Sequence, residues 1–243
     1  MSRLPSLSVA LPAYNEESNL PRMVEDVLEK AGALSADLEV IIVDDGSRDR
    51  TAAVGRELAQ RHPAVRLVSH PQNRGYGAAV WTGLTSAQKE TIFFTDSDRQ
   101  FDLAELGKLA AALDDADLAV GYRSPRRDPF MRRLNGWGWS RLVTLLFGYT
   151  ARDIDCAFKL MRRSVVDRLR EQVQSRGAAF SAELLVRAKA EGFRILEVPI
   201  HGHRPRVAGS PTGARPAVIF RAFRELLSFR ATLRRESRPV RAT

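Results

Sequence analysis

The chain of 243 residues has one cysteine and no long apolar run. Its single cysteine, Cys156, excludes an internal disulfide and fits a reducing compartment such as the cytoplasm. Because no run of about 18 apolar residues occurs, we expect no membrane-spanning helix, and the first residues show no signal peptide. Internal repeats and low-complexity segments are absent as well. With 44% apolar and 28% charged residues, the composition predicts a globular protein with a substantial core.

Negative charge is scarce relative to positive charge. Lysine and arginine number 38, aspartate and glutamate 29, and the formal net charge is +9. Such a chain favours an anionic partner, which can be nucleic acid, an anionic bilayer or a phosphorylated metabolite, although a solvated basic surface is the simpler interpretation. We expect no nucleic-acid partner, because no recognised binding motif is present and acidic strand ends would face phosphate badly.

Short apolar runs alternate with helical patterns as far as about residue 121. Strands are predicted at residues 7–11, 38–43, 65–68, 92–95, 118–120 and 193–200. Helices are predicted at residues 19–32, 49–58, 75–87, 102–113, 134–147, 180–190 and from about 217 onward. The alternation predicts an α/β fold, with a mostly parallel, twisted, Rossmann-like sheet and helices on both faces. We divide the chain into a domain over residues 1–212 and a basic amphipathic C-terminal helix and tail over residues 213–243.

Two acidic clusters follow two of these strands directly. Asp44 and Asp45 come after the second strand, and Asp96 and Asp98 after the fourth. Right-handed crossovers place the ends of parallel strands on one edge, where ligands bind in open α/β sheets, so the four carboxylates are expected to lie together. Their mutual repulsion requires a cation. A hard divalent cation, held by Asp96, Asp98 and an oxygen of Gln100 and carrying a phosphorylated ligand, meets that requirement.

Several of these segments also have a structural interpretation. Asp44 and Asp45 can belong to an acidic turn. Residues 11–17 can form a nucleoside pocket, with Tyr14 against the base and Glu16 accepting from a ribose hydroxyl, or only a turn into a helix. Residues 73–77 can cradle phosphate or form a flexible helix entry. They are not a P-loop, since no G-K-[ST] follows, and they are not a dinucleotide fingerprint.

Four segments taken in order resemble the family 2 glycosyltransferases of the GT-A fold, namely residues 11–17, 43–51, 73–79 and 95–102. Four more are similar to segments of the dolichol- and polyprenyl-phosphate mannose synthase branch, namely residues 121–123, 153–159, 182–184 and 206–210. The resemblance covers roughly residues 6–215. Arg99 departs from it, because relatives more often carry a small or apolar residue there, which implies a changed charge beside the metal. The C-terminal membrane helices of many relatives are not seen in this sequence.

The resemblance implies an activity and a set of site residues. The activity is that of an inverting, metal-dependent glycosyltransferase, moving a hexose from a nucleotide sugar of the GDP-mannose or UDP-glucose type to a polyprenyl phosphate. The nucleotide sugar would be bound by Pro12, Tyr14, Glu16, Asp44, Asp45, Asn73, Gly75, Asp96 and Ser97. Mg²⁺ or Mn²⁺ would be held by Asp96, Asp98 and Gln100. Acceptor and donor phosphates would be bound by Arg123, Arg132, Arg133, Arg206 and Ser210. The catalytic set would be Asp98, Arg123, Asp155 and Glu183.

Some of these assignments keep an alternative. Asp155 either serves the site or orients Arg123 or Lys159 through a salt bridge, and Glu183 either faces the acceptor or makes a helix-end contact. The helix at 134–147 and the C-terminal helix either pack in the core or in a homodimer, or lie in the plane of an anionic membrane. If the helices lie in the plane of the membrane, the protein would be peripheral on the cytoplasmic face of the plasma membrane.

Two other functions are carried forward. One is a glycosyltransferase of the same fold that acts on a soluble glycan or a glycolipid, which would not depend on an isoprenoid tail. The other is a membrane-recruited module that binds a nucleotide sugar without turnover, and it would form no product.

Overall fold

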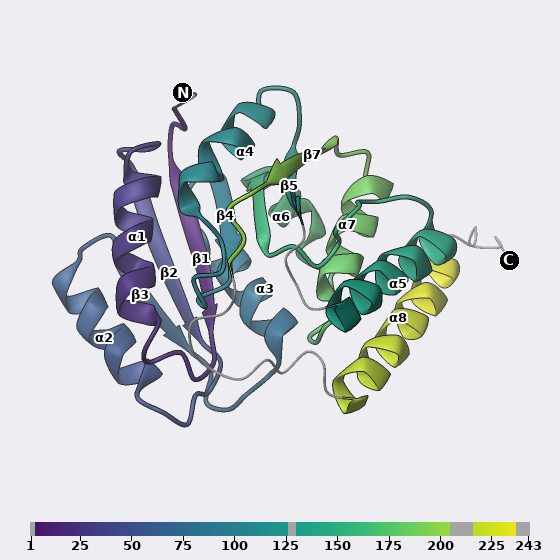
Figure 1. Ribbon diagram of the computed structural model, residues 1–243, viewed down its shortest axis with the longest axis horizontal. Coiled ribbons are helices and arrows are strands. Elements are labelled where there is room, and N and C mark those ends of the chain that lie inside the picture. Colours follow the sequence, from purple (N-terminus) through teal and green to yellow (C-terminus); the bar gives the residue numbers. More distant parts are fainter. Residues whose placement is uncertain (1–2, 126–129, 205–215, 237–243) are drawn as a thin grey trace, which may run out of the picture.

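A seven-stranded sheet forms the centre of the protein, in the order β3-β2-β1-β4-β6-β5-β7. The computed structural model in Figure 1 describes residues 3–125, 130–204 and 216–236. The strands are β1 (Leu7–Ala13), β2 (Leu38–Asp44), β3 (Val65–Ser69), β4 (Thr91–Thr95), β5 (Leu118–Arg123), β6 (Phe158–Arg162) and β7 (Ile195–Ile200). The helices are α1 (Leu20–Gly32), α2 (Thr51–Arg61), α3 (Tyr76–Ser86), the short 3₁₀ helix η1 (Leu103–Glu105), α4 (Leu106–Ala112), α5 (Phe130–Phe147), α6 (Arg163–Leu169), α7 (Phe180–Ala190) and α8 (Pro216–Glu236).

Neighbouring strands are parallel except at β6, which runs antiparallel to both β4 and β5. The mostly parallel sheet predicted from the sequence is therefore confirmed. β1, β2 and β3 end at one level, because Ala13 pairs with Asp44 and Asp44 pairs with Ser69. The reversed β6 begins at Phe158, opposite Thr95 at the end of β4. The ends of the parallel strands and the segment that leads into β6 thus meet at one edge, called here the carboxyl edge.

The strands send alternate side chains into two cores, one on each face of the sheet. Val40 and Ile42 of β2 belong to the core shared with α1, α2 and α4. Ile41 and Val43 belong to the core shared with α3, α6 and α7. Strands buried on both faces have apolar residues at consecutive positions, which is why these runs do not alternate with polar residues. The helices on both faces that the sequence predicts are confirmed.

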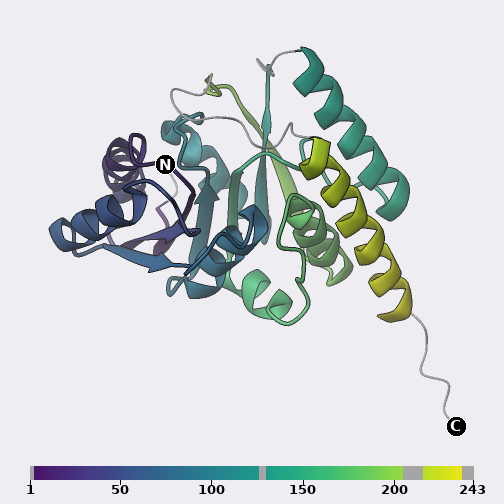
Figure 2. The same cartoon turned by 90° about the horizontal axis from the view of Figure 1, so that it is seen from below.

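The helices α5 and α8 lie side by side beyond α7, as the two views in Figures 1 and 2 show. Trp139 of α5 packs edge-on against Phe223 of α8, and Phe147 stacks on Phe229. The same order along both helices means that they run in parallel. Leu226 and Phe229 belong to the core on the α3 face, so α8 packs on the sheet domain. In the described part of the chain, no helix is long and apolar enough to cross a membrane.

Two elements were not predicted, and β1 continues past the residue at which it was expected to end. β6 and α6 escape prediction because β6 passes directly into α6 at Arg162 and Arg163, with no glycine or proline to mark a boundary. The first strand was expected to end before Pro12, but it continues to Ala13. The pairing with β4 stops at Ala10, while the pairing with β2 continues. Proline, which has no N–H to donate, is tolerated where a strand has one neighbour.

Candidate functional site

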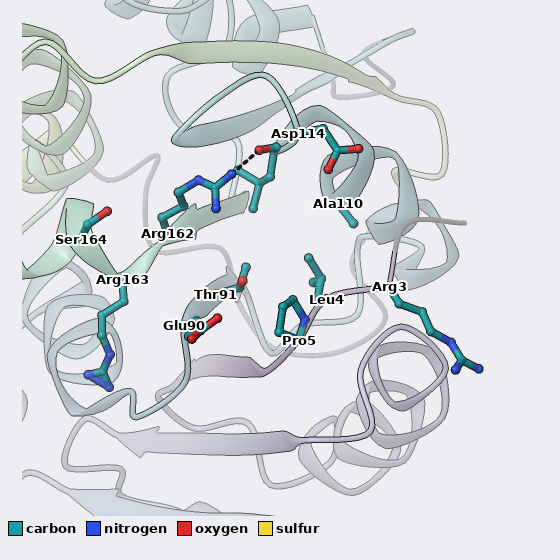
Figure 3. Close-up of a pocket in the computed structure, with 11 residues that line it drawn as sticks. Arg3, Leu4, Pro5, Glu90, Thr91, Ala110, Asp114, Arg162, Arg163 and Ser164 are labelled. Carbon is teal, nitrogen blue, oxygen red and sulfur yellow. Dashed lines mark hydrogen bonds between the residues drawn. The ribbon is translucent and has the colours of Figure 1, made fainter.

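A pocket lies at the edge opposite the carboxyl edge, where β4 begins and β6 ends (Figure 3). Arg162 and Arg163 contribute to its lining, but both guanidinium groups also donate to main-chain oxygens, Arg162 to Leu113 at 2.7 Å and Arg163 to Ala87 at 2.5 Å. None of the described residues that line this pocket is among those assigned to a ligand from the sequence. The candidate site is therefore built at the carboxyl edge.

The segment after β4 presents two carboxylates there. Ser97 is buried, and its hydroxyl donates to the main-chain oxygen of Pro12 at 2.8 Å, which joins the ends of β4 and β1. Asp98 is buried and accepts from the main-chain N–H of Gln100 at 3.1 Å. Asp96 is half-buried. Ser97 thus holds the segment in place while Asp96 and Asp98 flank it.

Tyr76, the first residue of α3, is joined to this segment. Its hydroxyl donates to Asp96 Oδ1 at 3.0 Å. The residue as a whole is 40% exposed. Partial burial of its hydroxyl, the charge of Asp96 and the hydrogen bond to it raise the pKa of Tyr76 well above its usual value, and the charges of Asp155 and Asp98 add to the effect. The charges of two segments, after β4 and before β6, therefore keep this one hydroxyl protonated.

Arg99 and Gln100, the two residues after Asp98, are bonded to different neighbours. Arg99 adopts a positive φ of 59°, and its guanidinium pairs with Asp26 of α1, with Nε 3.3 Å from Oδ2. The arginine expected to change the charge beside the metal is thus paired with a carboxylate on α1. Gln100 donates from Nε2 to the main-chain oxygen of Arg204 at 3.0 Å, which holds the segment after β7 against the cluster.

At the end of β2, Asp44 and Asp45 have different surroundings. Asp44 accepts from the main-chain N–H of Ser47 at 3.1 Å. Asp45 accepts from the main-chain N–H groups of Arg74 and Gly75, each at 2.9 Å, and contacts His70 Nδ1 at 2.6 Å. With three internal partners, Asp45 holds the turn over residues 73–75 in place. Asn73 is exposed on that turn, and its amide donates to the Asp45 main-chain oxygen at 3.2 Å.

Gly75 is required by its surroundings. Its φ of +102° is a conformation that other residues rarely adopt, and a Cβ there would lie 2.7 Å from the Arg176 main-chain oxygen. The N–H of Ala78 donates to that same oxygen at 3.0 Å. The glycine-rich turn is therefore packed closely between Asp45 on one side and the segment before α7 on the other.

The end of β1 supplies Tyr14 and Glu16. Tyr14 is half-buried and Glu16 is buried. Glu16 accepts from the Asn19 amide at 2.6 Å, and its main-chain N–H donates to the Thr51 hydroxyl at 2.8 Å. The second bond joins the segment after β1 to the start of α2, and Ala13 at the end of β1 pairs with Asp44 at the end of β2. Tyr14, Glu16 and Asp44 therefore belong to one side of the carboxyl edge.

Arg123 ends β5 and pairs with Asp153, a residue to which the sequence assigned no role. Two nearly parallel bonds join them, Nε to Oδ2 at 2.7 Å and Nη2 to Oδ1 at 2.8 Å. Lys159, buried within β6, donates from Nζ to the main-chain oxygens of Ile154 and Cys156. Burial lowers the pKa of Lys159. These bonds order the segment that enters β6, on which Asp155 is exposed.

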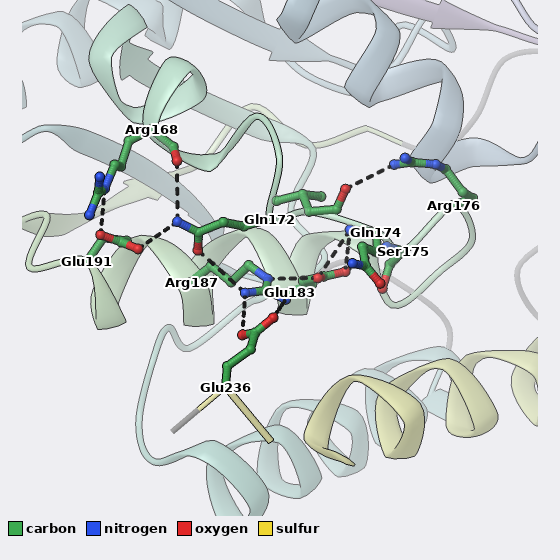
Figure 4. A network of polar contacts seen from close by, with 10 residues as sticks. Arg168, Gln172, Gln174, Ser175, Arg176, Glu183, Arg187, Glu191 and Glu236 are labelled. Carbon is green, nitrogen blue, oxygen red and sulfur yellow. Dashed lines mark hydrogen bonds and ion pairs between the residues drawn. The ribbon is translucent and has the colours of Figure 1, made fainter. Parts of the chain in front are cut away.

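Glu183 is bonded inside the protein through both oxygens. The Ser175 N–H donates to Oε2 at 2.7 Å, the Gln174 N–H lies 3.2 Å from each oxygen, and Arg187 Nε is 2.8 Å from Oε1. Figure 4 shows this network continuing through Arg187 to Glu236 on α8. Glu183 is 1% exposed. Its contacts support the helix-end alternative over a catalytic one.

The side chains of the other four residues assigned to phosphate lie outside the described residues. Arg132 and Arg133 fall in the first turn of α5, and their side chains lie outside the described residues. Arg206 and Ser210 also lie outside the described residues. Of the five residues assigned to phosphate, the structure thus places Arg123.

The donor set after β4 suits a hard divalent cation. Asp96 and Asp98 are oxygen donors, and Mg²⁺ in proteins is commonly held by one or two carboxylates, with water and substrate phosphates completing its shell. Mn²⁺ also prefers oxygen ligands. Within the described ranges, no three His, Cys, Asp or Glu side chains are grouped so as to hold a metal by themselves. A cation here fits if a bound diphosphate supplies further ligands.

Three residues of this arrangement were not found from the sequence: Tyr76, His70 and Asp153. Tyr76 follows Gly75 directly, and a hydroxyl at a helix start beside a glycine-rich turn was the available signal. The others are recognisable only through their partners, because Asp153 and Arg123 are thirty residues apart and His70 and Asp45 twenty-five.

Comparisons with known proteins agree with this geometry. The family model described as Glycosyl transferase family 2 matches residues 8–170. The chain is 33% identical over 214 residues to dolichyl-phosphate beta-glucosyltransferase of Drosophila melanogaster, and 32% identical over 215 residues to the Homo sapiens protein of the same name. Each alignment covers 80% of this chain and 66% of the relative, so the chain spans just under two thirds of their length.

Solved structures show the same fold. Glucosyl-3-phosphoglycerate synthase from Mycobacterium tuberculosis, in complex with Mg²⁺ and uridine-diphosphate, superposes with a TM-score of 0.71 at 21% identity. The superposition covers 93% of this chain and 80% of that one. The predicted GT-A fold is confirmed. The chain belongs to glycosyl transferase family 2, among relatives named as dolichyl-phosphate glycosyltransferases.

Proposed function

We propose that this protein is an inverting, metal-dependent glycosyltransferase that moves a hexose from a nucleotide sugar to a polyprenyl phosphate at the cytoplasmic face of a membrane. One observation carries the proposal. Carboxylates after β2 and β4 and the guanidinium of Arg123 after β5 converge on one edge of the sheet. Negative groups for a metal and positive groups for phosphate are what a diphosphate donor and a phosphate acceptor require.

The donor would be bound from β1 to β4. Tyr14, Glu16 and Asp44 would hold the nucleoside, and the turn over residues 73–75, fixed by Asp45, leads from there into α3. Asp96, Asp98 and Gln100 would hold Mg²⁺ or Mn²⁺ on the diphosphate. The cation would neutralise the charge that grows on the leaving nucleoside diphosphate.

The acceptor would be bound near Arg123, which Asp153 orients by two-point pairing. A phosphate oxygen of the acceptor attacks the anomeric carbon, and the bond from that carbon to the diphosphate oxygen breaks. The bonding electrons leave with the nucleoside diphosphate, and in-line attack inverts the configuration. Because the acceptor phosphate is already ionised, the protein has to position it more than to deprotonate it.

The relatives supply the finer choices. Their names give dolichyl phosphate as acceptor and glucose as the sugar, so glucose is the hexose we favour over mannose. A polyprenyl acceptor also fits the basic second half of the chain. The single buried cysteine is consistent with the cytoplasmic face.

A transfer assay tests the proposal. The purified chain is incubated with Mg²⁺ or Mn²⁺, a polyprenyl phosphate and a panel of labelled UDP- and GDP-sugars, with and without EDTA. We expect label in the lipid extract from one donor, and none with EDTA. Transfer to a soluble glycan or glycolipid instead, or nucleotide binding without any product, would overturn the proposal in favour of one of the two alternatives.

A variant pair assigns the metal site. Asp98→Asn removes a charge from the cluster after β4, and Asp115→Asn removes one from an exposed loop before β5. We expect Asp98→Asn to abolish transfer and Asp115→Asn to leave it unchanged, with both variants folded by circular dichroism. Full activity of Asp98→Asn would contradict the assignment of the metal.

A further inference from the structure

The outer sides of α5 and α8 are unusually apolar for a surface. On α5 the exposed residues Leu134, Trp137, Arg141 and Leu145 recur at spacings of three and four, which places them on one stripe. On α8 the corresponding stripe holds Phe220, Phe223, Arg224, Leu227 and Arg234. Trp137 is 62% exposed, Leu145 80%, Phe220 66% and Leu227 59%. These nine residues are called here the helix-pair surface.

The opposite sides of both helices pack on one core, so the two stripes face away from it together. Val143 of α5 and Leu226 and Phe229 of α8 are buried in the core on the α3 face. The helices are adjacent and parallel in both views (Figures 1 and 2). The inner sides of the two helices already fill the core. The exposed apolar side chains on the outer sides are therefore not needed for packing within the protein.

The helix-pair surface contains no acidic residue. α5 has no aspartate or glutamate, and α8 has only Glu225 and Glu236. Glu225 accepts from the Ala179 N–H at 3.3 Å, and Glu236 pairs with the buried Arg187 at 3.1 Å, as Figure 4 shows. Both glutamates are thus used to attach α8 to the protein. On the outer side, the guanidinium of Arg141 lies over the Trp137 ring, 5.7 Å from its centroid.

We propose that the helix-pair surface is where this protein lies on an anionic lipid bilayer. The proposal rests on the proposed function, because it names the surface that would bring the site to a lipid-borne acceptor. Apolar side chains of an in-plane helix enter the boundary of the acyl chains, arginines bind anionic headgroups, and tryptophan favours the interface between them.

The charges favour a bilayer over a second copy of the chain. In a symmetric dimer the same patch would meet itself, so two positively charged patches, each carrying Arg141, Arg224 and Arg234, would be brought together. The patch has no carboxylate to pair with them, and like charges brought together without partners oppose association. A bilayer with anionic headgroups supplies the missing charge at the rim and the apolar phase at the centre.

The helix-pair surface lies next to the carboxyl edge, because α5 follows β5 closely in the chain. β5 ends at Arg123, and α5 begins seven residues later, at Phe130. Figure 2 shows the start of α5 close to the end of β5. A phosphate held at Arg123 would therefore lie near the membrane-facing helix, while the isoprenoid tail stays in the lipid.

The test is vesicle flotation of the full chain, without nucleotide sugar and without polyprenyl phosphate. Vesicles of phosphatidylcholine alone are compared with vesicles that also contain phosphatidylglycerol. We expect binding to the anionic vesicles, loss of binding at high salt, and a blue shift of tryptophan fluorescence that Trp137→Phe diminishes. Because no substrate is present, failure here would leave the proposed transfer reaction intact, and failure of the transfer assay would leave vesicle binding intact.

Two pairs of variants make the test specific. Leu145→Ser with Leu227→Ser should lower partitioning by about a hundredfold or more, since two leucine side chains leave the apolar phase, while the exposed Leu196→Ser on β7 should not. Arg141→Gln with Arg224→Gln should lower it about fivefold per arginine, while Arg61→Gln at the end of α2 should not.

Three outcomes would overturn the proposal. The first is no binding to either kind of vesicle by the folded protein. The second is binding that the surface variants and their controls reduce equally. The third is a homodimer, measured by sedimentation velocity without lipid, that the Leu145→Ser and Leu227→Ser changes dissociate.

Discussion

The hydroxyl of Tyr76 donates to Asp96 Oδ1 at 3.0 Å and so joins the first residue of α3 to the end of β4. This bond uses one oxygen of a carboxylate that the proposed reaction requires for a metal. It constrains the Asp96 side chain before any cation arrives. Tyr76 is therefore a positioning residue in the proposed mechanism, acting through Asp96.

Tyr76→Phe removes this bond and keeps the ring. A hydrogen bond to a charged group contributes about 1.5–3 kcal/mol, so we expect kcat/KM of transfer to fall roughly tenfold or more. The concentration of Mg²⁺ or Mn²⁺ needed for half-maximal activity should rise as well, which steady-state kinetics over a metal titration would measure.

Tyr149→Phe is the matched control for this change. Its hydroxyl donates to Glu197 on β7, which is also a tyrosine–carboxylate bond but lies outside the cluster after β4. We expect an unchanged metal requirement in this variant. Equal effects of the two substitutions would show that Tyr76 has no special relation to the metal.

Gly75→Ala should destabilise the protein and weaken donor binding. The φ of +102° and the 2.7 Å approach to the Arg176 main-chain oxygen leave no room for a methyl group, so we expect a loss of about 2 kcal/mol in the free energy of unfolding. Urea denaturation measures this. Gly138→Ala is the control, because a Cβ there meets nothing within 4 Å in the middle of α5, and it should stabilise by about 0.5–1 kcal/mol.

Glu183→Gln separates a structural role from a catalytic one. Removing the charge leaves Arg187 without one partner in a buried pair, so we expect the free energy of unfolding to fall by about 3 kcal/mol. At a temperature where the variant is folded, kcat should stay near that of the parent protein. A stable but inactive variant would restore the catalytic assignment. Glu29→Gln, at the exposed ion pair with Lys30, should change neither quantity.

Cys156 should resist alkylation in the native protein. Burial raises the pKa of its thiol to about 12, so at pH 8 the reactive thiolate is almost absent and the sulfur is also covered. Mass spectrometry after iodoacetamide treatment at pH 8 should find the thiol unmodified in native protein and modified in denaturant. Rapid labelling of the folded chain would mean that the segment before β6 opens readily.

The sequence by itself determined most of the sheet and the placement of the two acidic clusters. The runs at residues 38–43 and 92–95 are apolar at every position or nearly so, and such short runs between helical patterns predict strands buried on both faces. Once the strands are parallel, Asp44 and Asp96 must come to the same edge. The family followed from the order of four local motifs, each of which lies within a single loop.

Only the tertiary structure decided which charges pair. Arg123 pairs with Asp153, and Asp45 accepts from the Gly75 N–H. A reversed strand and a crossover bring these distant segments together, and no local sequence pattern encodes such contacts. The role of Glu183 could not be assigned from the sequence. A glutamate near the start of a helix can bond main-chain N–H groups inside the protein or contact a substrate, and the local sequence is the same in both cases. Propensity and periodicity act over a few residues, whereas the partners of a buried charge are set by packing.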